Sequence, residues 1–311
     1  MDFLFIILGL VLLVFGGDWL LKAAVGLSLR LNISKIVIGM TVVSFATSAP
    51  ELIVSVKSAI SGFPDIALGN VVGSNIANIG LILAVVMIIS KMKIDESFFK
   101  TDWPAMIFSS LLLVGILLYD GQIGRIDGII LVVLLISLIV YLIKSQKNKN
   151  QDIEIPLEEA MSMYKIIGFL IIGGAALYGG SEFLIKGAVN VAQAFGVSDR
   201  VIAVTVVAIG TSIPELAASL IAAIKKESSI SIGNVIGSNI FNILSVLGLT
   251  AIIHPIKLVD NRLLTFDIYW MLGFSFVLLP LIYLPQKGFL DRKAGVILLA
   301  SYILFIYLTF T

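Results

Sequence analysis

One short motif occurs twice in this chain, each time inside a long apolar segment, and it restricts how the chain can fold. Residues 39–51 read GMTVVSFATSAPE and residues 203–215 read AVTVVAIGTSIPE, so both copies contain Thr-Ser-x-Pro-Glu. A proline inside a helix removes a backbone hydrogen bond and kinks or breaks the helix. A charged group at the centre of a membrane span costs about 2.5–3.5 kcal/mol or more. A chain that places such a costly group twice is predicted to use it.

The composition predicts a membrane protein. Of the 311 residues, 59% are hydrophobic and 13% are charged, and the mean hydropathy is +1.09. A soluble domain of this length would have too few charges to cover its surface. The net charge of +1, without any Lys/Arg-rich tract, argues against nucleic acid as a partner, and the absence of cysteine excludes disulfides and thiolate metal sites. The first apolar run is longer than a signal peptide core, so we expect a retained helix.

Apolar segments of about 20 residues, separated by short polar breaks, predict ten transmembrane helices. They are expected near residues 3–29, 35–61, 66–90, 103–119, 125–143, 163–193, 199–224, 230–253, 264–283 and 290–309. The longest polar stretch follows the fifth helix and contains KSQKNKNQDIEIPLEE. It is too short to form a domain. We therefore expect a first unit at 1–143, a linker at 144–162 and a second unit at 163–311.

The two units repeat each other with a constant offset of 164 positions. The matching pairs are Glu51 and Glu215, Gly69 and Gly233, Asn75 and Asn239, Asp18 and Glu182, Lys22 and Lys186, and Ser34 and Ser198. One offset across three helices indicates a duplication. Because five helices per unit is an odd number, the two copies must have opposite orientations in the membrane. The predicted fold is all-α: ten transmembrane helices in two inverted-topology five-helix repeats, an architecture typical of secondary transporters.

The distribution of basic residues predicts the orientation. The loops after the first, third, fifth, seventh and ninth helices hold fourteen lysines and arginines, and the other loops hold five. Loops rich in Lys and Arg face the cytoplasm. We therefore expect a multi-pass protein of the cell membrane with a cytoplasmic linker and both termini outside.

The Pro-Glu motif predicts a site for a hard cation. A helix broken by proline exposes carbonyl and hydroxyl oxygens, and broken helices persist in membranes where they line a cavity or are buried in protein. Glu51 and Glu215 would each lie among such oxygens, the ligands that Ca²⁺ prefers. The alternative is a proline kink with a glutamate paired to a basic residue, but the first segment has no basic residue in its apolar core. An enzyme using the glutamates as an acid pair is a further alternative, and no nucleophile–base pair accompanies them; we expect no enzyme.

A second duplicated motif follows in the next predicted helix. Residues 69–78 read GNVVGSNIAN, and GNVIGSNIFN occurs 164 positions later. Ser74 and Asn78 are four residues apart, as are Ser238 and Asn242, so each pair shares one helix face. For the glycines we favour close helix packing. For the serine and asparagine face we favour cation ligands over interhelical hydrogen bonds.

Asp18 and Glu182 each precede a lysine by four residues, Lys22 and Lys186. We favour an ion pair within the helix for both. A role in gating or cation entry is the alternative.

These residues resemble the calcium/cation antiporter superfamily, specifically its prokaryotic sodium/calcium exchanger branch. The likeness covers nearly the whole chain: paired G-T-S-x-P-E signatures, each followed by G-N-x-x-G-S-N. The resemblance implies that the second, third, seventh and eighth helices surround a site for Ca²⁺ and Na⁺, and that the first and sixth helices slide across it. The implied Ca²⁺ ligands are Glu51, Glu215, Thr47 and Thr211. The implied Na⁺ ligands are Ser48, Ser212, Ser74 and Ser238, with backbone carbonyls near Ser44 and Ala208.

The chain departs from the family pattern in three places. Ala46 stands where the first signature usually has glycine, while Gly210 is intact in the second. Asn78 and Asn242 are both amides, whereas an aspartate in the second half resembles the potassium-dependent branch, so we expect no K⁺ dependence. The linker is too short for the calcium-sensing domains of animal exchangers.

The predicted function is antiport, with several Na⁺ moving inward and one Ca²⁺ outward through one shared site. Two carboxylates in a low dielectric are costly when empty, so crossing is expected only with bound cations. The main alternative is Ca²⁺/H⁺ antiport, because glutamates can also carry protons; a channel is a weaker one. The expected partners are the transported ions and the lipid bilayer, with no cofactor. The sequence leaves the oligomeric state open.

Overall fold

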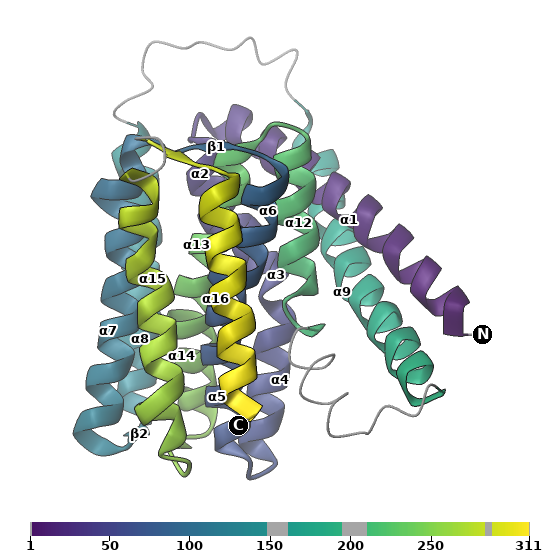
Figure 1. The fold of residues 1–311 in the computed structure, drawn as a ribbon. Coiled ribbons are helices and arrows are strands. Elements are labelled where there is room, and N and C mark those ends of the chain that lie inside the picture. Colours follow the sequence, from purple (N-terminus) through teal and green to yellow (C-terminus); the bar gives the residue numbers. More distant parts are fainter. Residues whose placement is uncertain (1, 148–160, 195–209, 284–287, 311) are drawn as a thin grey trace.

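The computed structural model describes residues 2–147, 161–194, 210–283 and 288–310, which form helices and two short sheets (Figure 1). Among the described residues, eight helices are long and apolar enough to cross a membrane, or up to nine if one bent pair counts as a span. The protein is therefore an all-helical polytopic membrane protein. The seventh predicted helix, 199–224, is described only from residue 210 onward.

The eight long spans contain several π-helical turns, labelled η, within otherwise α-helical segments. In chain order they are α1 (Asp2–Leu31); α5, η2 and α6 (Pro64–Ala77, Asn78–Leu83, Ala84–Ile89); η3 and α7 (Phe98–Asp102, Trp103–Asp120); α8 (Arg125–Lys147); α9 (Met163–Ala194); α13, η5 and α14 (Ser228–Phe241, Asn242–Leu247, Gly248–Ile253); η6 and α15 (Leu263–Asp267, Ile268–Tyr283); and α16 (Arg292–Phe310). The bent pair comprises α2, η1 and α3 (Lys35–Ile38, Gly39–Val43, Ser44–Thr47) followed by α4 (Ala49–Ile60), and α12 spans Ile213–Ile224.

Two predicted boundaries differ from the structure by several residues. The fourth span begins at Phe98 instead of 103. The added turn contains the polar residue Asp102, whose carboxylate is hydrogen-bonded locally: Ser97 Oγ donates to Asp102 Oδ2 at 3.1 Å. Helix α8 continues to Lys147, beyond the predicted end at 143. Lysine and glutamine are good helix formers, so the helix extends past the apolar segment.

The centre of the bundle consists of two spans. The spans Pro64–Ile89 and Ser228–Ile253 are 72% and 83% buried, whereas the other six are 22–39% buried. Their neighbours include α7, α8, α15 and α16, and also α12 and η1. A span that is buried on every side can carry polar groups without exposing them to lipid, and these two spans contain the duplicated serine and asparagine motif.

Two short antiparallel sheets connect the first half of the chain to the second. Strand β1 (Met92–Lys93) pairs with β4 (Phe289–Leu290), and β2 (Gln122–Ile123) pairs with β3 (Ile256–Lys257). Figure 1 shows β1 at one end of the bundle and β2 at the other. Strands β1 and β3 occupy equivalent places in the duplicated sequence, 164 positions apart (256 − 92). They therefore lie at opposite ends of the molecule.

Helices α1 and α9 pack against each other along their length and lie obliquely beside the rest of the bundle (Figure 1). Glycines allow this close approach. A Cβ added at Gly9 would lie 2.8 Å from the carbonyl oxygen of Gly180, and one added at Gly16 would lie 3.0 Å from that of Gly173. Such contacts leave no room for a side chain. The two helices therefore form one closely packed pair.

Candidate functional site

The first Pro-Glu motif lies at a bend between two helices. Segments Lys35–Thr47 and Ala49–Ile60 meet at 46°, and Ser48 at the junction has φ −84° and ψ 8°. Pro50 is the second residue of α4, a position where its missing N–H is tolerated. The break therefore precedes the proline by two residues, and Pro50 has no N–H to donate to the carbonyl of Ala46.

The second motif has the same local geometry where it is described. Ser212 has φ −89° and ψ 3°, and Pro214 is the second residue of α12. Both motifs thus place a carboxylate in the first turn of a helix. The partial positive charge of a helix N-terminus favours an anionic side chain there.

The two glutamates are buried together at the centre of the protein. Glu51 is 0% exposed and Glu215 is 1% exposed, and their carboxylates are close enough to interact electrostatically. Glu215 faces a hydroxyl of the other half, because Ser48 Oγ donates to Glu215 Oε1 at 3.1 Å. No basic residue pairs with either glutamate among the described ion pairs, so the kink-and-ion-pair alternative is not supported.

The serine and asparagine motif contributes buried polar atoms from the two central spans. Ser74, Asn78, Ser238 and Asn242 are each at most 2% exposed. Both asparagines begin π-helical turns, η2 and η5. Such turns are frequent at functional sites because they interrupt the regular α-helical hydrogen bonds.

Many of these buried atoms have no hydrogen-bond partner in the described part of the chain. Eleven described residues carry such an atom, and seven of them are predicted ligands: Glu51, Ser74, Asn78, Ser212, Glu215, Ser238 and Asn242. An unpaired buried polar group costs about 1–3 kcal/mol, and native proteins contain few of them. Their concentration around two carboxylates fits the oxygen ligands of a hard cation.

The remaining predicted ligands surround the same place where they are described. Thr47 is fully buried, and its Oγ1 lies 3.3 Å from the Ser44 carbonyl oxygen. Ser44 Oγ donates to the carbonyl of Gly39 at 2.9 Å and is within 3.0 Å of that of Asn234. Ala208 lies outside the described residues, so its place stays a prediction.

The sequence analysis missed a set of residues that hold the site together. Asn70 Nδ2 donates to Ser55 Oγ at 3.0 Å and to the Glu51 carbonyl at 3.3 Å. The equivalent Asn234 donates to Ser219 Oγ at 2.9 Å and to the Glu215 carbonyl at 3.4 Å. The available signal was the duplication, because these asparagines and serines recur at the same offset of 164.

A second asparagine network crosses between the central spans. Asn75 Nδ2 donates to the Asn239 carbonyl at 3.2 Å, and Asn242 Nδ2 donates to Asn75 Oδ1 at 3.0 Å. These bonds join η5 and α13 to α5 beside the predicted ligands. Asn242 Oδ1 keeps no partner among the described groups.

The predicted close packing of the motif glycines is confirmed for the second copy only. In the first copy, no described atom lies within 4 Å of a Cβ added at Gly69 or Gly73, so for contacts with the described part of the chain the prediction was wrong there. A Cβ added at Gly233 would clash with the Ile36 carbonyl, and one at Gly237 would lie 2.5 Å from Met40 Cα. Helix α13 therefore contacts the backbone of α2 and η1 directly.

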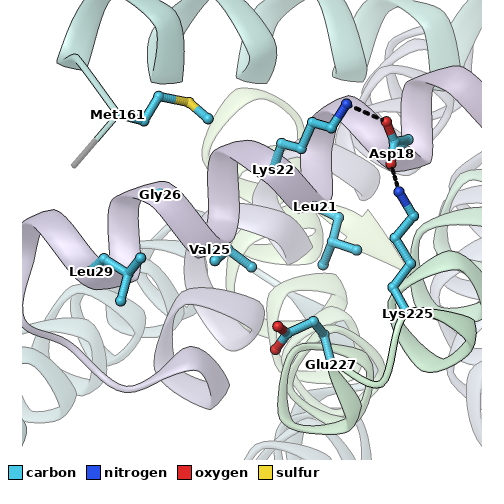
Figure 2. A pocket seen from close by; sticks show the side chains of 9 residues that line it. All are labelled: Asp18, Leu21, Lys22, Val25, Gly26, Leu29, Met161, Lys225 and Glu227. Atoms are coloured by element: carbon cyan, nitrogen blue, oxygen red, sulfur yellow. Dashed lines mark hydrogen bonds and ion pairs between the residues drawn. The ribbon is translucent and has the colours of Figure 1, made fainter. Parts of the chain in front are cut away.

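A separate polar cluster connects α1 to the end of α12. Lys22 Nζ lies 2.8 Å from Asp18 Oδ2, as the sequence predicts, and Lys225 also pairs with Asp18. The cluster borders a pocket of about 390 Å³, which Figure 2 shows between α1 and the turn after α12. None of the predicted ligands lines this pocket.

The equivalent pair in the second half does not form. No ion pair joins Glu182 to Lys186 in the described structure; Lys186 Nζ instead lies 4.9 Å from the ring centroid of Phe5. The prediction was wrong for this pair because α1 packs against α9 and supplies an aromatic face for the lysine.

Comparisons with known proteins agree with this geometry. The family described as sodium/calcium exchanger protein matches residues 1–144 and 165–311. The putative antiporter CaxA of Alkalimonas amylolytica is 37% identical over 99% of this chain and 98% of its own. The sodium/calcium exchanger MaX1 of Methanosarcina acetivorans is 31% identical over 99% and 98%.

Solved structures agree as well. The sodium-calcium exchanger NCX_Mj, soaked with Na⁺ and Sr²⁺, has a TM-score of 0.83 and 32% sequence identity, covering 98% of this chain and 97% of that one. With Na⁺ and Ca²⁺, the same exchanger gives a TM-score of 0.82. The matched regions include both duplicated motifs and all the central helices. The chain therefore belongs to the sodium/calcium exchanger family of the calcium/cation antiporter superfamily.

Proposed function

We propose that this cation antiporter exchanges Na⁺ for Ca²⁺ by alternating access through the buried site between its two halves. Glu51 and Glu215 bind Ca²⁺ together with Thr47 and Thr211. Ser48, Ser212, Ser74, Ser238, Asn78, Asn242 and the carbonyls near Ser44 and Ala208 complete the cation sites. The names of relatives such as the exchanger MaX1 support this assignment.

One observation carries the proposal: two buried carboxylates share a site with hydroxyl and amide oxygens that have no protein partner among the described groups. In a membrane, such groups cannot obtain their hydrogen bonds from lipid. Cations satisfy the oxygens and neutralise the carboxylates at once. An exchanger gains from this because the loaded states are favoured over the empty one, which prevents leakage of one ion without the other.

The proposed architecture is two inverted five-helix repeats, 1–143 and 163–311, joined by a linker at 144–162. Helices α4 and α12 support this architecture, because their first residues are 164 positions apart (213 − 49). So do the equivalent π-helical turns η2 and η5. Sites between such repeats lie near the membrane midplane.

The test is uptake of radioactive Ca²⁺ into proteoliposomes loaded with Na⁺, with and without an imposed pH gradient. We expect uptake that requires the outward Na⁺ gradient. Glu51→Gln and Glu215→Gln should each reduce it by about a hundredfold or more, because an interaction with a buried charge is worth about 3–5 kcal/mol. Glu96→Gln is the control, because Glu96 forms an exposed pair with Lys100 and such pairs contribute little.

Uptake driven by the pH gradient alone would contradict Na⁺ coupling and assign the protein to Ca²⁺/H⁺ antiport through the same glutamates. Full activity of both glutamine variants would show that neither glutamate binds the transported ions.

A further inference from the structure

We propose that Asn70 and Asn234 are positioning residues that orient the threonine hydroxyls of the opposite half for cation binding. Neither asparagine belongs to the ligand set proposed above. The inference rests on the proposed function, because it takes Thr47 and Thr211 as cation ligands.

The geometry is clearest at Asn234, which is fully buried. Its Nδ2 donates to Ser219 Oγ at 2.9 Å and to the Glu215 carbonyl at 3.4 Å. A backbone carbonyl can only accept, so this end of the side chain must be the NH₂ group. The orientation of the amide is thereby fixed, and its Oδ1 lies 3.2 Å from Thr47 Oγ1.

The same arrangement recurs in the first half. Asn70 Nδ2 donates to Ser55 Oγ and to the Glu51 carbonyl, and its Oδ1 accepts from Thr211 Oγ1 at 3.4 Å. Each asparagine therefore contacts the glutamate helix of its own half and the threonine of the other half. Two independent copies of one arrangement argue for a shared purpose.

The purpose follows from the chemistry of a hydroxyl ligand. A threonine hydroxyl has one proton and two lone pairs. To bind a cation it must direct a lone pair toward the ion, so its proton must point to another acceptor. Thr47 Oγ1 has the Ser44 carbonyl oxygen at 3.3 Å, and that oxygen is itself a proposed cation ligand. Asn234 Oδ1 offers the proton a neutral acceptor that leaves the Ser44 carbonyl free.

This arrangement predicts that each asparagine is energetically coupled, in Ca²⁺ binding, to the threonine it contacts in the other half. Without Asn234, the Thr47 proton would turn to an oxygen that the cation needs, and Ca²⁺ binding would weaken through Thr47. Thr211 should be unaffected, because its acceptor is Asn70. The opposite pattern is expected for Asn70. A general loss of packing would show no such preference for one threonine.

The experiment is a pair of double-mutant cycles on the full-length protein in detergent, with the Ca²⁺ dissociation constant measured by isothermal titration calorimetry. Asn234→Ala is combined with Thr47→Val, and Asn70→Ala with Thr211→Val. The matched controls are the exchanged combinations, Asn234→Ala with Thr211→Val and Asn70→Ala with Thr47→Val. Asn70 is only partly buried, so its cycle remains readable if Asn234→Ala does not fold.

We expect each asparagine variant alone to weaken Ca²⁺ binding about tenfold, the size of one good hydrogen bond. In the background of its partner threonine variant, the further loss should be within about twofold. The control combinations should show the full loss of both changes. Additive losses in the partner combinations, or equal coupling to both threonines, would overturn the inference.

Failure of the proposed function would look different. Wild-type protein without Na⁺-dependent Ca²⁺ uptake in proteoliposomes would contradict exchange, whereas the cycles measure Ca²⁺ binding itself. Wild-type protein that exchanges normally but shows additive cycles would contradict only the positioning role.

Discussion

Two pairs of buried serines in this protein show opposite hydrogen-bonding behaviour. Ser109 and Ser110 in α7 donate to the carbonyls four residues earlier, at 2.8 and 2.9 Å. Ser74 and Ser238 in the central spans have no partner among the described groups. A serine that bonds back to its own helix is satisfied. The unpaired serines lower stability, which is consistent with a role in binding a cation.

This contrast predicts that Ser238→Ala separates stability from transport. Removing an unpaired buried hydroxyl removes a cost of about 1–3 kcal/mol, so the melting temperature without added cations should stay the same or rise by a few degrees. The Na⁺ concentration needed for half-maximal exchange should rise several-fold. Thermal unfolding and Na⁺-dependent Ca²⁺ uptake measure the two effects.

Ser110→Ala is the matched control, because it removes a hydroxyl that already has a partner and lies outside the proposed site. It should leave the Na⁺ dependence unchanged. A Ser238→Ala protein that is less stable yet transports normally would show that the hydroxyl serves packing only.

At the scale of elements, the position of α13 depends on its close contact with η1. The glycines at 233 and 237 bring the two backbones together, and the next residue after Gly237 is Ser238. The spacing of small residues that permits this contact therefore also sets where the serine hydroxyl lies relative to Ser44 and Thr47. Packing and cation binding therefore depend on adjacent residues of one helix.

Gly237→Ala should disturb both the packing of α13 and the binding of the cation. Its Cβ would clash with Ser44 Oγ and lie 2.6 Å from the Met40 carbonyl oxygen, so we expect a loss of about 1–3 kcal/mol in stability together with weaker Ca²⁺ binding. Gly115→Ala in α7 is the control, because no described atom lies within 4 Å of a Cβ there. It should be neutral or stabilising by about 0.5–1 kcal/mol. Equal stability of the two variants in thermal unfolding would contradict the packing argument.

At the scale of the whole molecule, equivalent residues of the duplicated sequence lie at opposite ends of the bundle. Lys93 in β1 and Lys257 in β3 are 164 positions apart (257 − 93), and both are exposed. Each strand pairs with a strand from the other half of the chain. The proposed orientation, with both termini outside and the linker in the cytoplasm, places Lys93 inside and Lys257 outside.

The chain has no cysteine, so single substitutions test this directly. Lys257→Cys should react with a membrane-impermeant maleimide in intact cells, and Lys93→Cys should react only after the membrane is opened. Labelling of both positions from the same side would contradict the inverted topology. Labelling of Lys93→Cys alone in intact cells would keep the inversion and reverse the orientation.

The sequence determined the membrane class, the duplicated motifs and the pair of glutamates. Hydropathy, proline and charge act locally, so their effects can be recognised from short stretches of the chain and from the repeat of those stretches. It also predicted which serines and asparagines share a helix face, since helical spacing fixes that within a few residues. The tertiary structure decided which hydroxyl meets which acceptor: Thr47 and Asn234 are 187 residues apart, and Thr211 and Asn70 are 141 apart. Such partners follow from how two helices cross, and no local property of the chain encodes the crossing. For the same reason Lys186 contacts the aromatic ring of Phe5 and not Glu182, although Glu182 and Lys186 are four residues apart on one helix.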